Sequence, residues 1–268
     1  MSASLTQDSR RGVTLPEVLV AAGVLVLLVG VSIPAVGRVR GEARSTECLS
    51  HLRQLSVAAR TYAEIHRERL PPAVVYLARP GGVVTHCWDF RHLPGGVVEP
   101  GALRGLTDRP ELVQQCPCCE VSSTFGNDPA TGYNYNTSFL GTEGRMPTVA
   151  PDGTILDGWR NARLGIPPAR HRRPEKAALL GDGGWSSGAN KFMRAPSNSI
   201  ENDWGMVYAG GQAFRHDGRT NVAWLDGHCS SLATPHGGPL GEGPIAANIL
   251  GFPANGFLSE DDTAYDPR

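Results

Sequence analysis

The six cysteines of this 268-residue chain have the widest choice of chemistry among its side chains; they are Cys48, Cys87, Cys116, Cys118, Cys119 and Cys229. An even number of cysteines in an exported chain permits up to three disulfides, in any of fifteen pairings. Thiolates also bind metals, but Cys116-Pro117-Cys118-Cys119 supplies a single C-x-x-C step, whereas a zinc ribbon has two. Disulfides, free thiols and a metal site stay open as three interpretations, in that order of preference.

A histidine and an aspartate near the C-terminus, His216 and Asp226, are the next candidates, because an imidazole and a carboxylate can share a proton or bind an ion. A predicted hairpin places them on adjoining strands, which predicts a hydrogen bond between them. They lack a nucleophile, a full ligand set and the clustered aspartates of an EF-hand. We therefore expect no catalytic residue, no metal ligand and no enzyme activity. Asp226 and Gly227 are predicted to form a tight turn; calcium is the candidate ion, and no other cofactor is expected.

The third candidate is Glu17, a carboxylate at the start of an apolar run that continues to Val36. About 19 residues at ~1.5 Å each span roughly 28 Å, close to the ~30 Å hydrocarbon core of a membrane. A carboxylate costs roughly 2.5–3.5 kcal/mol at the centre of a membrane helix and less near an end. Glu17 therefore stays at the interface or has a partner. A cleaved secretory signal, a twin-arginine signal at Arg10-Arg11 and a buried soluble helix are the alternatives for this run.

Residue patterns around these candidates predict an α+β fold, in which a long hydrophobic and amphipathic helix packs on a C-terminal antiparallel sheet with long loops. The helix is expected over residues 13–68, and Pro71-Pro72 stops it. Pro34 predicts a bend or flexible joint near the membrane exit. The second half of the helix has small or apolar residues at a spacing of three and four, which line one face: Cys48, Leu52, Leu55, Ala59, Tyr62 and Ile65.

Short apolar runs bounded by proline and glycine predict strands at 73–77, 82–85 and 177–180. Asp-Gly pairs, which favour tight hairpin turns, separate three further runs near the C-terminus. These runs predict a three-stranded antiparallel meander at 212–216, 221–225 and 228–232. The last ~30 residues are rich in Gly, Pro and Asp and are expected to form a loop or tail. Within them, Glu260-Asp261-Asp262 is expected to be an acidic tail fragment.

Three groups of motifs resemble those of the planctomycete-type DUF1559 prepilin-like proteins. Residues 10–17, Arg-Arg-Gly-Val-Thr-Leu-Pro-Glu, resemble the type IV prepilin cleavage and methylation motif, although Val13 and Pro16 depart from its usual phenylalanine and aliphatic residue. Nine residues, 217–225, separate His216 from Asp226-Gly227, as in the H-X9-DG signature of that family. The remaining similarities are spread between these two ends: Ala43-Arg44, Cys48, Leu52, Leu55, Tyr62, Pro71-Pro72, Cys116-Pro117 and Gly132–Asn136.

The resemblance implies a structural, pseudopilin-class subunit of a type II secretion or pilus-like system. A prepilin peptidase would cleave after Gly12 and methylate the new amine of Val13, one helical turn from Glu17. That glutamate would pair with its own amine or a neighbour's and set the register of a filament. The implied organisation is a leader at 1–12, a membrane and filament helix at 13–36, its amphipathic continuation at 37–70 and a head at 71–268.

The implied partners are like subunits in a homo- or hetero-filament, the prepilin peptidase, an assembly platform and the membrane. The implied location is the inner membrane, with a single span and a periplasmic head. A formal net charge of −1 gives a nucleic-acid partner no electrostatic support. Two alternatives stay open: a single-span envelope protein with a ligand-binding head that does not polymerise, and an exported enzyme.

Overall fold

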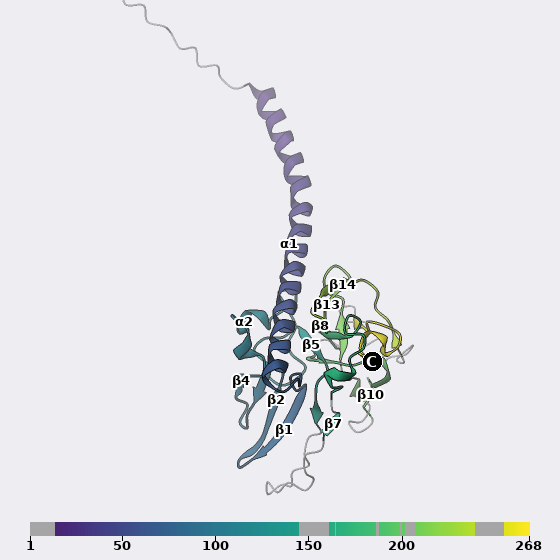
Figure 1. Ribbon diagram of the computed structural model, residues 1–268. Helices are drawn as coiled ribbons and strands as arrows, with labels where there is room; N and C mark the ends of the chain where they lie inside the picture. The colour runs from purple at the N-terminus through teal and green to yellow at the C-terminus, as the bar shows by residue number, and fades with distance from the viewer. Residues whose placement is uncertain are drawn as a thin grey trace, which may run out of the picture. The chain divides into compact units, whose positions relative to one another are not determined.

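The computed structural model describes residues 14–144, 161–163, 165–185, 188–198, 200–201, 207–208, 210–238 and 255–268. The predicted leader and both residues at the predicted cleavage point, Gly12 and Val13, lie outside these ranges. The chain divides into two compact units, Met1–Ala43 and Arg44–Arg268. One long helix precedes a domain of mostly antiparallel strands, so the predicted α+β class is confirmed (Figure 1). The predicted boundaries after residues 12, 36 and 70 stay predictions.

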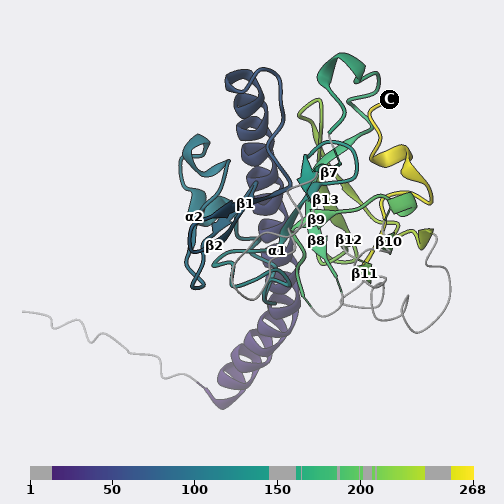
Figure 2. The same ribbon diagram turned by 90° about the horizontal axis from the view of Figure 1, so that it is seen from below.

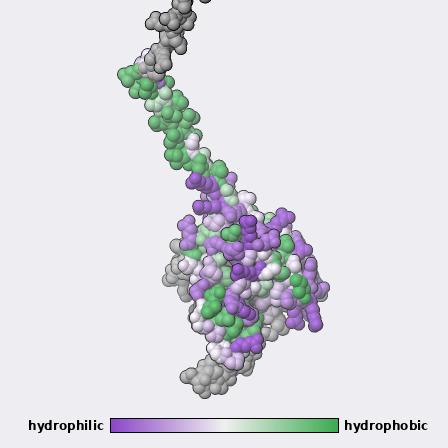
Figure 3. Space-filling model, turned by 90° about the vertical axis from the view of Figure 1, so that its left-hand side faces the viewer, coloured by the Kyte–Doolittle hydropathy of each residue, from purple (hydrophilic) through white to green (hydrophobic). Residues whose placement is uncertain are grey.

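Helix α1 covers Leu15–Ile65 and is continuous through Pro34. A flexible joint there stays a prediction about motion. The most apolar stretch of α1 has no buried residue, and Figure 3 shows it as a nearly unbroken band of hydrophobic surface. Among the described residues, α1 is the one helix long and apolar enough to cross a membrane.

The second half of α1 packs into the domain through the face that the periodicity predicts. Cys48, Leu52, Leu55 and Ala59 are fully buried, and Tyr62 is half-buried. Ile65 was expected on this face but is 63% exposed, because the helix leaves the core after Tyr62. Figures 1 and 2 show this part of α1 between the sheet of β1 (Val74–Arg79) and the sheet of β8 (Ala178–Gly184).

The helix ends three residues earlier than expected, at Ile65. Arg67 and Glu68 both take left-handed conformations, with φ of 55° and 62°. The Glu68 N–H donates to the carbonyl of Ala63 at 2.7 Å, which closes the last turn in the manner of a C-cap. Local capping therefore ends the helix before the two prolines are reached.

The first sheet contains six of the described strands in the order β4-β3-β2-β1-β6-β7. Strands β1 and β2 form an antiparallel hairpin from Val74↔Cys87 to Arg79↔Gly82 around Pro80-Gly81, so the predicted strands at 73–77 and 82–85 are confirmed. The other bounds are β2 Gly82–Cys87, β3 Phe90–His92, β4 Val98–Pro100, β6 Glu143–Gly144 and β7 Asn161–Arg163.

The second sheet has the order β14-β13-β8-β12-β15, and β5 adds to it by pairing with β8 and β9. Strand β8 confirms and extends the predicted strand at 177–180, and all seven of its residues are buried. The bounds are β5 Tyr133–Asn136, β9 Phe192–Met193, β12 Gly211–Ala213, β13 Thr220–Trp224, β14 Cys229–Leu232 and β15 Asn255–Gly256. A separate described pair is β10 Ile200–Glu201 with β11 Val207–Tyr208.

The described short helices connect these strands. They are η1 Arg104–Leu106, α2 Pro110–Val113, η2 Pro168–Arg170, η3 Pro196–Asn198 and η6 Asp262–Ala264.

The predicted meander is half right. Strands β13 and β14 pair as expected, from Thr220↔Leu232 to Ala223↔Cys229. Strands β12 and β13 do not pair with each other, because each pairs with β8. The turn at Asp217-Gly218 is nonetheless tight, with φ of 53° and 74°, and its flanking residues His216 and Arg219 exchange backbone hydrogen bonds of 3.0 and 3.1 Å. The Asp217-Gly218 pair predicted the turn correctly, but it did not predict which strands pair on either side of the turn.

The C-terminal end is folded where the structure describes it, contrary to the expected loop or tail. Strand β15 pairs with β12, and Tyr265 is fully buried with its hydroxyl accepting the Leu258 N–H at 2.8 Å. The acidic residues of this segment contact the protein: Glu260 with His236, Asp261 with Thr263, and Asp262 with Ser197. The expectation of a free acidic tail fragment is therefore wrong.

A buried cluster of cysteine, histidine and aspartate

Three residues singled out from the sequence meet in the core, together with one that the sequence did not single out as a site residue. Cys48 comes from α1, Cys116 from the loop after α2, and His216 from the turn after β12. The addition is Asp182, in the middle of β8. All four are buried, and their candidate ligand atoms lie within 4.8 Å of one another. The fold thus gathers these side chains from four separate segments.

Local structure positions each member. Cys48 lies on the buried face of α1, where helical periodicity places it. The Cys116 N–H donates to the carbonyl of Thr131 at 3.0 Å, which holds the cysteine loop against the start of β5. Gly132 makes this approach tolerable: its φ is +118°, and a Cβ there would stand 2.5 Å from the Cβ of Cys116. His216 occupies the first position of the Asp217-Gly218 turn.

The four side chains form two close pairs. The Sγ atoms of Cys48 and Cys116 are 2.9 Å apart. The Nε2 atom of His216 lies 3.0 Å from Oδ2 of Asp182. The two pairs are farther from each other, because Cys116 Sγ lies 4.0 Å from His216 Nε2 and 4.0 Å from Asp182 Oδ1.

Several neighbouring groups stabilise the negative charge of the buried Asp182 carboxylate. Its Oδ2 atom accepts the backbone N–H of Asn221 at 2.7 Å as well as facing His216. The positive charge of Arg215, whose guanidinium donates to the carbonyl of Gly183, is also nearby. Burial alone lowers the pKa of His216, but the hydrogen bond and charge of Asp182, with those of Cys116, outweigh it and raise the pKa to about 10. His216 is therefore a cation paired with Asp182 at neutral pH.

The thiol of Cys116 is not activated for nucleophilic attack. Its hydrogen bond with Cys48, followed by burial, raises its pKa above the usual range of a thiol. A catalytic triad also needs both imidazole nitrogens, one for the nucleophile and one for the carboxylate. Here Cys116 and Asp182 both face Nε2 of His216. This geometry does not form a proton relay, and the absence of enzyme activity stays a prediction.

Two cysteines, a histidine and an aspartate are a donor set that zinc accepts. Calcium takes about 6–8 oxygen ligands, so two sulfurs and one carboxylate do not make a calcium site. The cluster can therefore hold either a thiophilic metal ion or a sulfur–sulfur bond between Cys48 and Cys116. In the second case His216 and Asp182 keep their contact of 3.0 Å, whereas a metal bound by all four side chains would break it.

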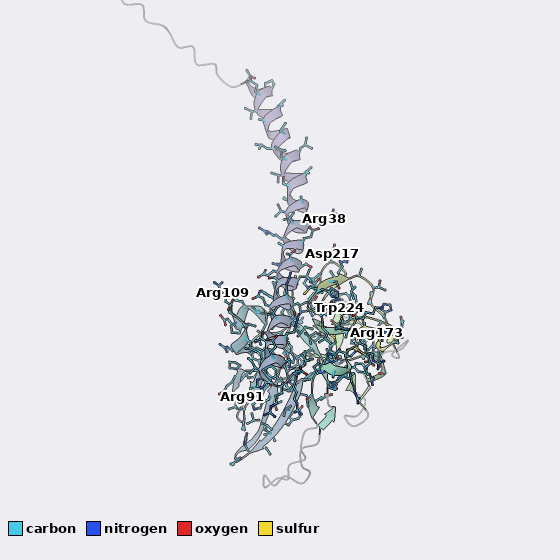
Figure 4. All side chains as sticks on the ribbon, in the orientation of Figure 1. Arg38, Arg91, Arg109, Arg173, Asp217 and Trp224 are labelled. Atoms are coloured by element: carbon cyan, nitrogen blue, oxygen red, sulfur yellow. The ribbon has the colours of Figure 1, made fainter. Side chains whose placement is uncertain are left out.

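The two ends of the H-X9-DG motif serve different parts of the head, and the predicted hydrogen bond between His216 and Asp226 is wrong. His216 is bonded to Asp182 inside the core. Asp226 instead accepts from Nδ1 of His228 at 2.6 Å on the surface. Its backbone carbonyl accepts from Arg60 of α1 at 3.1 Å. Figure 4 labels Asp217 and Trp224, which lie in the stretch between the two ends of the motif.

The predicted tight turn at Asp226-Gly227 is present. Gly227 has φ of +97°, and its N–H donates to the carbonyl of Trp224 at 2.9 Å. Asp226 itself stays out of the left-handed region, so the connection is a three-residue loop in which glycine supplies the positive φ. This turn delivers the carbonyl that Arg60 binds, and so fastens the hairpin to α1.

Of the other four cysteines, Cys87 and Cys229 lie on strands, whereas Cys118 and Cys119 follow Cys116 in the same loop and lie near it. Cys87 is buried in β2, and burial raises its pKa. Cys229 is half-buried in β14. Cys119 is buried and donates to the Val121 carbonyl at 3.6 Å. Cys118 is half-buried, and burial raises its pKa while His216 lowers it.

Glu17 caps the start of α1. Its Oε2 atom accepts both the backbone N–H and the hydroxyl of Thr14 at 2.8 Å. Thr14-Leu15-Pro16-Glu17 thus has the spacing and one of the two side-chain-to-backbone bonds of a capping box. The sequence contains this signal, a threonine three residues before a glutamate. Sequence reasoning placed Glu17 at the interface or with a partner, without identifying Thr14 as that partner.

A second buried set of charges crosses the core near β9. The ammonium of Lys191 lies 2.9 Å from Asp89 and 2.8 Å from Asp128, and all three side chains are almost inaccessible. Burial lowers the pKa of Lys191, but the two carboxylates outweigh it and raise the pKa. These ion pairs connect the segment after β2 with the segment before β9. The sequence pattern did not predict them.

Protein-family models, curated proteins and solved structures give no match to this chain. The argument for function therefore rests on the residues and on the geometry described above.

Proposed function

We propose that this chain is a prepilin-like, pseudopilin-class subunit whose N-terminal helix enters the membrane and whose head lies outside the cytoplasm. The observation that supports this proposal most strongly is that the two halves of helix α1 differ. Its first half is apolar and exposed, and one face of its second half is buried in an α+β domain. A soluble helix would not expose so many large apolar side chains, whereas a lipid or filament environment would cover them.

In this proposal a prepilin peptidase removes residues 1–12 and frees the amine of Val13. Glu17 then has two roles. Its Oε2 atom caps the helix through Thr14, and its remaining oxygen receives the amine of an adjacent subunit. Pairing of the two charges offsets the cost of placing each in a low-dielectric environment. The partners are then like subunits, the peptidase and an assembly platform in the inner membrane.

The test is photo-crosslinking between full-length subunits in native membranes. A benzophenone amino acid replaces Val26, which is 72% exposed on the apolar half of α1. We expect the wild type to give a ladder of oligomers, and Glu17→Ala to lose the ladder while remaining in the membrane fraction. Glu64→Ala, an exposed glutamate elsewhere on α1, is the matched control and should keep the ladder. Gly12→Leu should run as an unprocessed precursor.

Three other outcomes of these experiments would each contradict one part of the proposal. An unchanged ladder in Glu17→Ala would show that Glu17 is only a helix cap. Failure of the wild type to form any ladder would contradict the filament and favour the non-polymerising envelope protein. A single band of precursor size in the wild type would contradict the processing step.

A further inference from the structure

We infer that Cys48 and Cys116 form a disulfide that covalently fastens helix α1 to the head. Their Sγ atoms are 2.9 Å apart although the residues stand 68 positions apart in the chain. Carbon atoms in van der Waals contact lie about 3.5–4.0 Å apart, and sulfur is the larger atom. Two sulfurs at 2.9 Å are therefore closer than unbonded thiols pack, and they approach the bonded distance of about 2.05 Å.

The separation of the two sulfurs lies about midway between their distance in a disulfide, about 2.05 Å, and their distance in a zinc site. A tetrahedral zinc ion with bonds of about 2.3 Å to each sulfur would hold the two sulfurs about 3.8 Å apart. Cys48 and Cys116 would have to separate by most of an ångström to reach that distance. The other two members of the cluster are also engaged, because His216 Nε2 and Asp182 Oδ2 face each other at 3.0 Å.

The contacts of Asp182 distinguish a disulfide from a metal site. The same oxygen of Asp182 that faces His216 accepts the Asn221 N–H at 2.7 Å. A metal held by all four side chains would have to replace the contact between His216 Nε2 and Oδ2 of the buried Asp182 carboxylate. A disulfide leaves the contacts of Asp182 with His216 and Asn221 in place and gives up only the two longer contacts of the Cys116 thiol, at 4.0 Å each.

Formation of the bond is a thiol–disulfide exchange with a disulfide-form carrier protein as the oxidant. One cysteine thiolate attacks the carrier disulfide and releases one carrier thiol. The second cysteine then attacks the mixed disulfide, which forms the Cys48–Cys116 bond and releases the other carrier thiol. Two protons and two electrons pass from the cysteines to the carrier. Both cysteines are fully buried, so the exchange precedes final packing of the head.

The pairing of the cysteines does not depend on the proposed function, but the supply of oxidant does. Disulfide carriers act outside the cytoplasm, so oxidation in the cell rests on the proposed export of the head. The link joins α1 directly to the loop before β5. Force along the helix of an assembled subunit would then pass into the head through a covalent bond as well as through packing.

The experiment maps the thiols of the full-length protein purified from membranes in detergent without reductant. Free thiols are alkylated in denaturant with a metal chelator, and tryptic peptides are sequenced by mass spectrometry. We expect one linked pair of peptides that joins Cys48 to Cys116. Cys116, Cys118 and Cys119 share a peptide because no lysine or arginine separates them. A Cys118→Ala/Cys119→Ala double variant leaves Cys116 as the sole cysteine there and should keep the link.

A second sample is reduced, refolded and reoxidised with glutathione disulfide, and the zinc content of the untreated protein is measured. The same link in both samples supports the inference. A link only after glutathione treatment supports the pairing and contradicts export of the head. Alkylated Cys48 and Cys116 in both samples overturn the inference, and stoichiometric zinc in that case assigns the cluster to metal. A link from Cys48 to another cysteine also overturns it.

Discussion

Replacing His216 by glutamine gives the sharpest test of the buried cluster. A glutamine amide can still donate a hydrogen bond to Asp182, but it carries no charge and does not titrate. The pKa of His216 rises from 6.5 to about 10 in the folded chain. At about 1.36 kcal/mol per unit, this difference corresponds to at most about 5 kcal/mol of folding free energy. The histidine side chain is 1% exposed, so solvent screens the pair very little.

The raised pKa fixes the pH range in which this contribution appears. Because the folded chain binds the proton more tightly than the unfolded chain, the stabilisation is complete below pH 6.5 and is lost as the pH rises through about 10. The wild type should therefore be more stable than His216→Gln by several kcal/mol at pH 6. The gap should narrow steadily above pH 7 and nearly close at pH 10. Other titrating groups are common to both proteins and cancel in the comparison.

Urea unfolding of the two full-length proteins in the same detergent, at the same oxidation state, measures this gap. Tryptophan fluorescence is a suitable signal because Trp88 is buried in the core beside α1. A gap that stays constant from pH 6 to pH 10 would show that His216 is not a buried cation, and the proposed ion pair with Asp182 would be wrong. A gap that widens with pH would mean that the imidazole is neutral in the folded state.

Two further changes test the packing of α1 and the Asp-Gly turn. Leu55→Ala should cost about 2–5 kcal/mol in urea unfolding because Leu55 is fully buried in the main core, whereas Val57→Ala, at an exposed position of the same helix, should change stability little; equal effects would contradict the packing of α1. Gly227→Ala should cost about 1–3 kcal/mol, because φ is +97° there and a Cβ would stand 2.8 Å from Nη1 of Arg60. Gly105→Ala, with open space around its Cβ, is the control, and a loss as large as that of Gly227→Ala would refute the strain argument.

Much of the local structure was predictable because its causes lie within a few residues of each other. Helical spacing identified the buried face of α1 from Cys48 to Tyr62. Proline and glycine bounded the β1–β2 hairpin, and the two Asp-Gly pairs marked tight turns. The failures have a different origin. Ile65 is exposed because the domain ends beside it, and a periodic pattern contains no information about where its partner surface stops.

The partners of the site residues were beyond the reach of sequence reasoning. The sequence paired His216 with Asp226 because a hairpin joins them. Strands β12 and β13 both pair with β8 instead of with each other, and β8 supplies His216 with a different carboxylate. Asp182 lies in a glycine-rich run that matches no motif, and it lies beside His216 only because of the way the strands pair. The same long-range folding chose Cys116 for Cys48 out of five candidate cysteines.

The amino-acid sequence by itself determined a membrane-length apolar helix, the amphipathic face that follows it, a strand-rich head and the turns at both Asp-Gly pairs. Each of these depends on the repeat of a helix or strand, or on the backbone preference of one or two residues. Only the tertiary structure decided which strand β12 and β13 pair with, which carboxylate neutralises His216 and which sulfur lies beside Cys48. Those choices depend on contacts between residues 34 to 100 positions apart, and they are fixed by the packing of whole elements against one another.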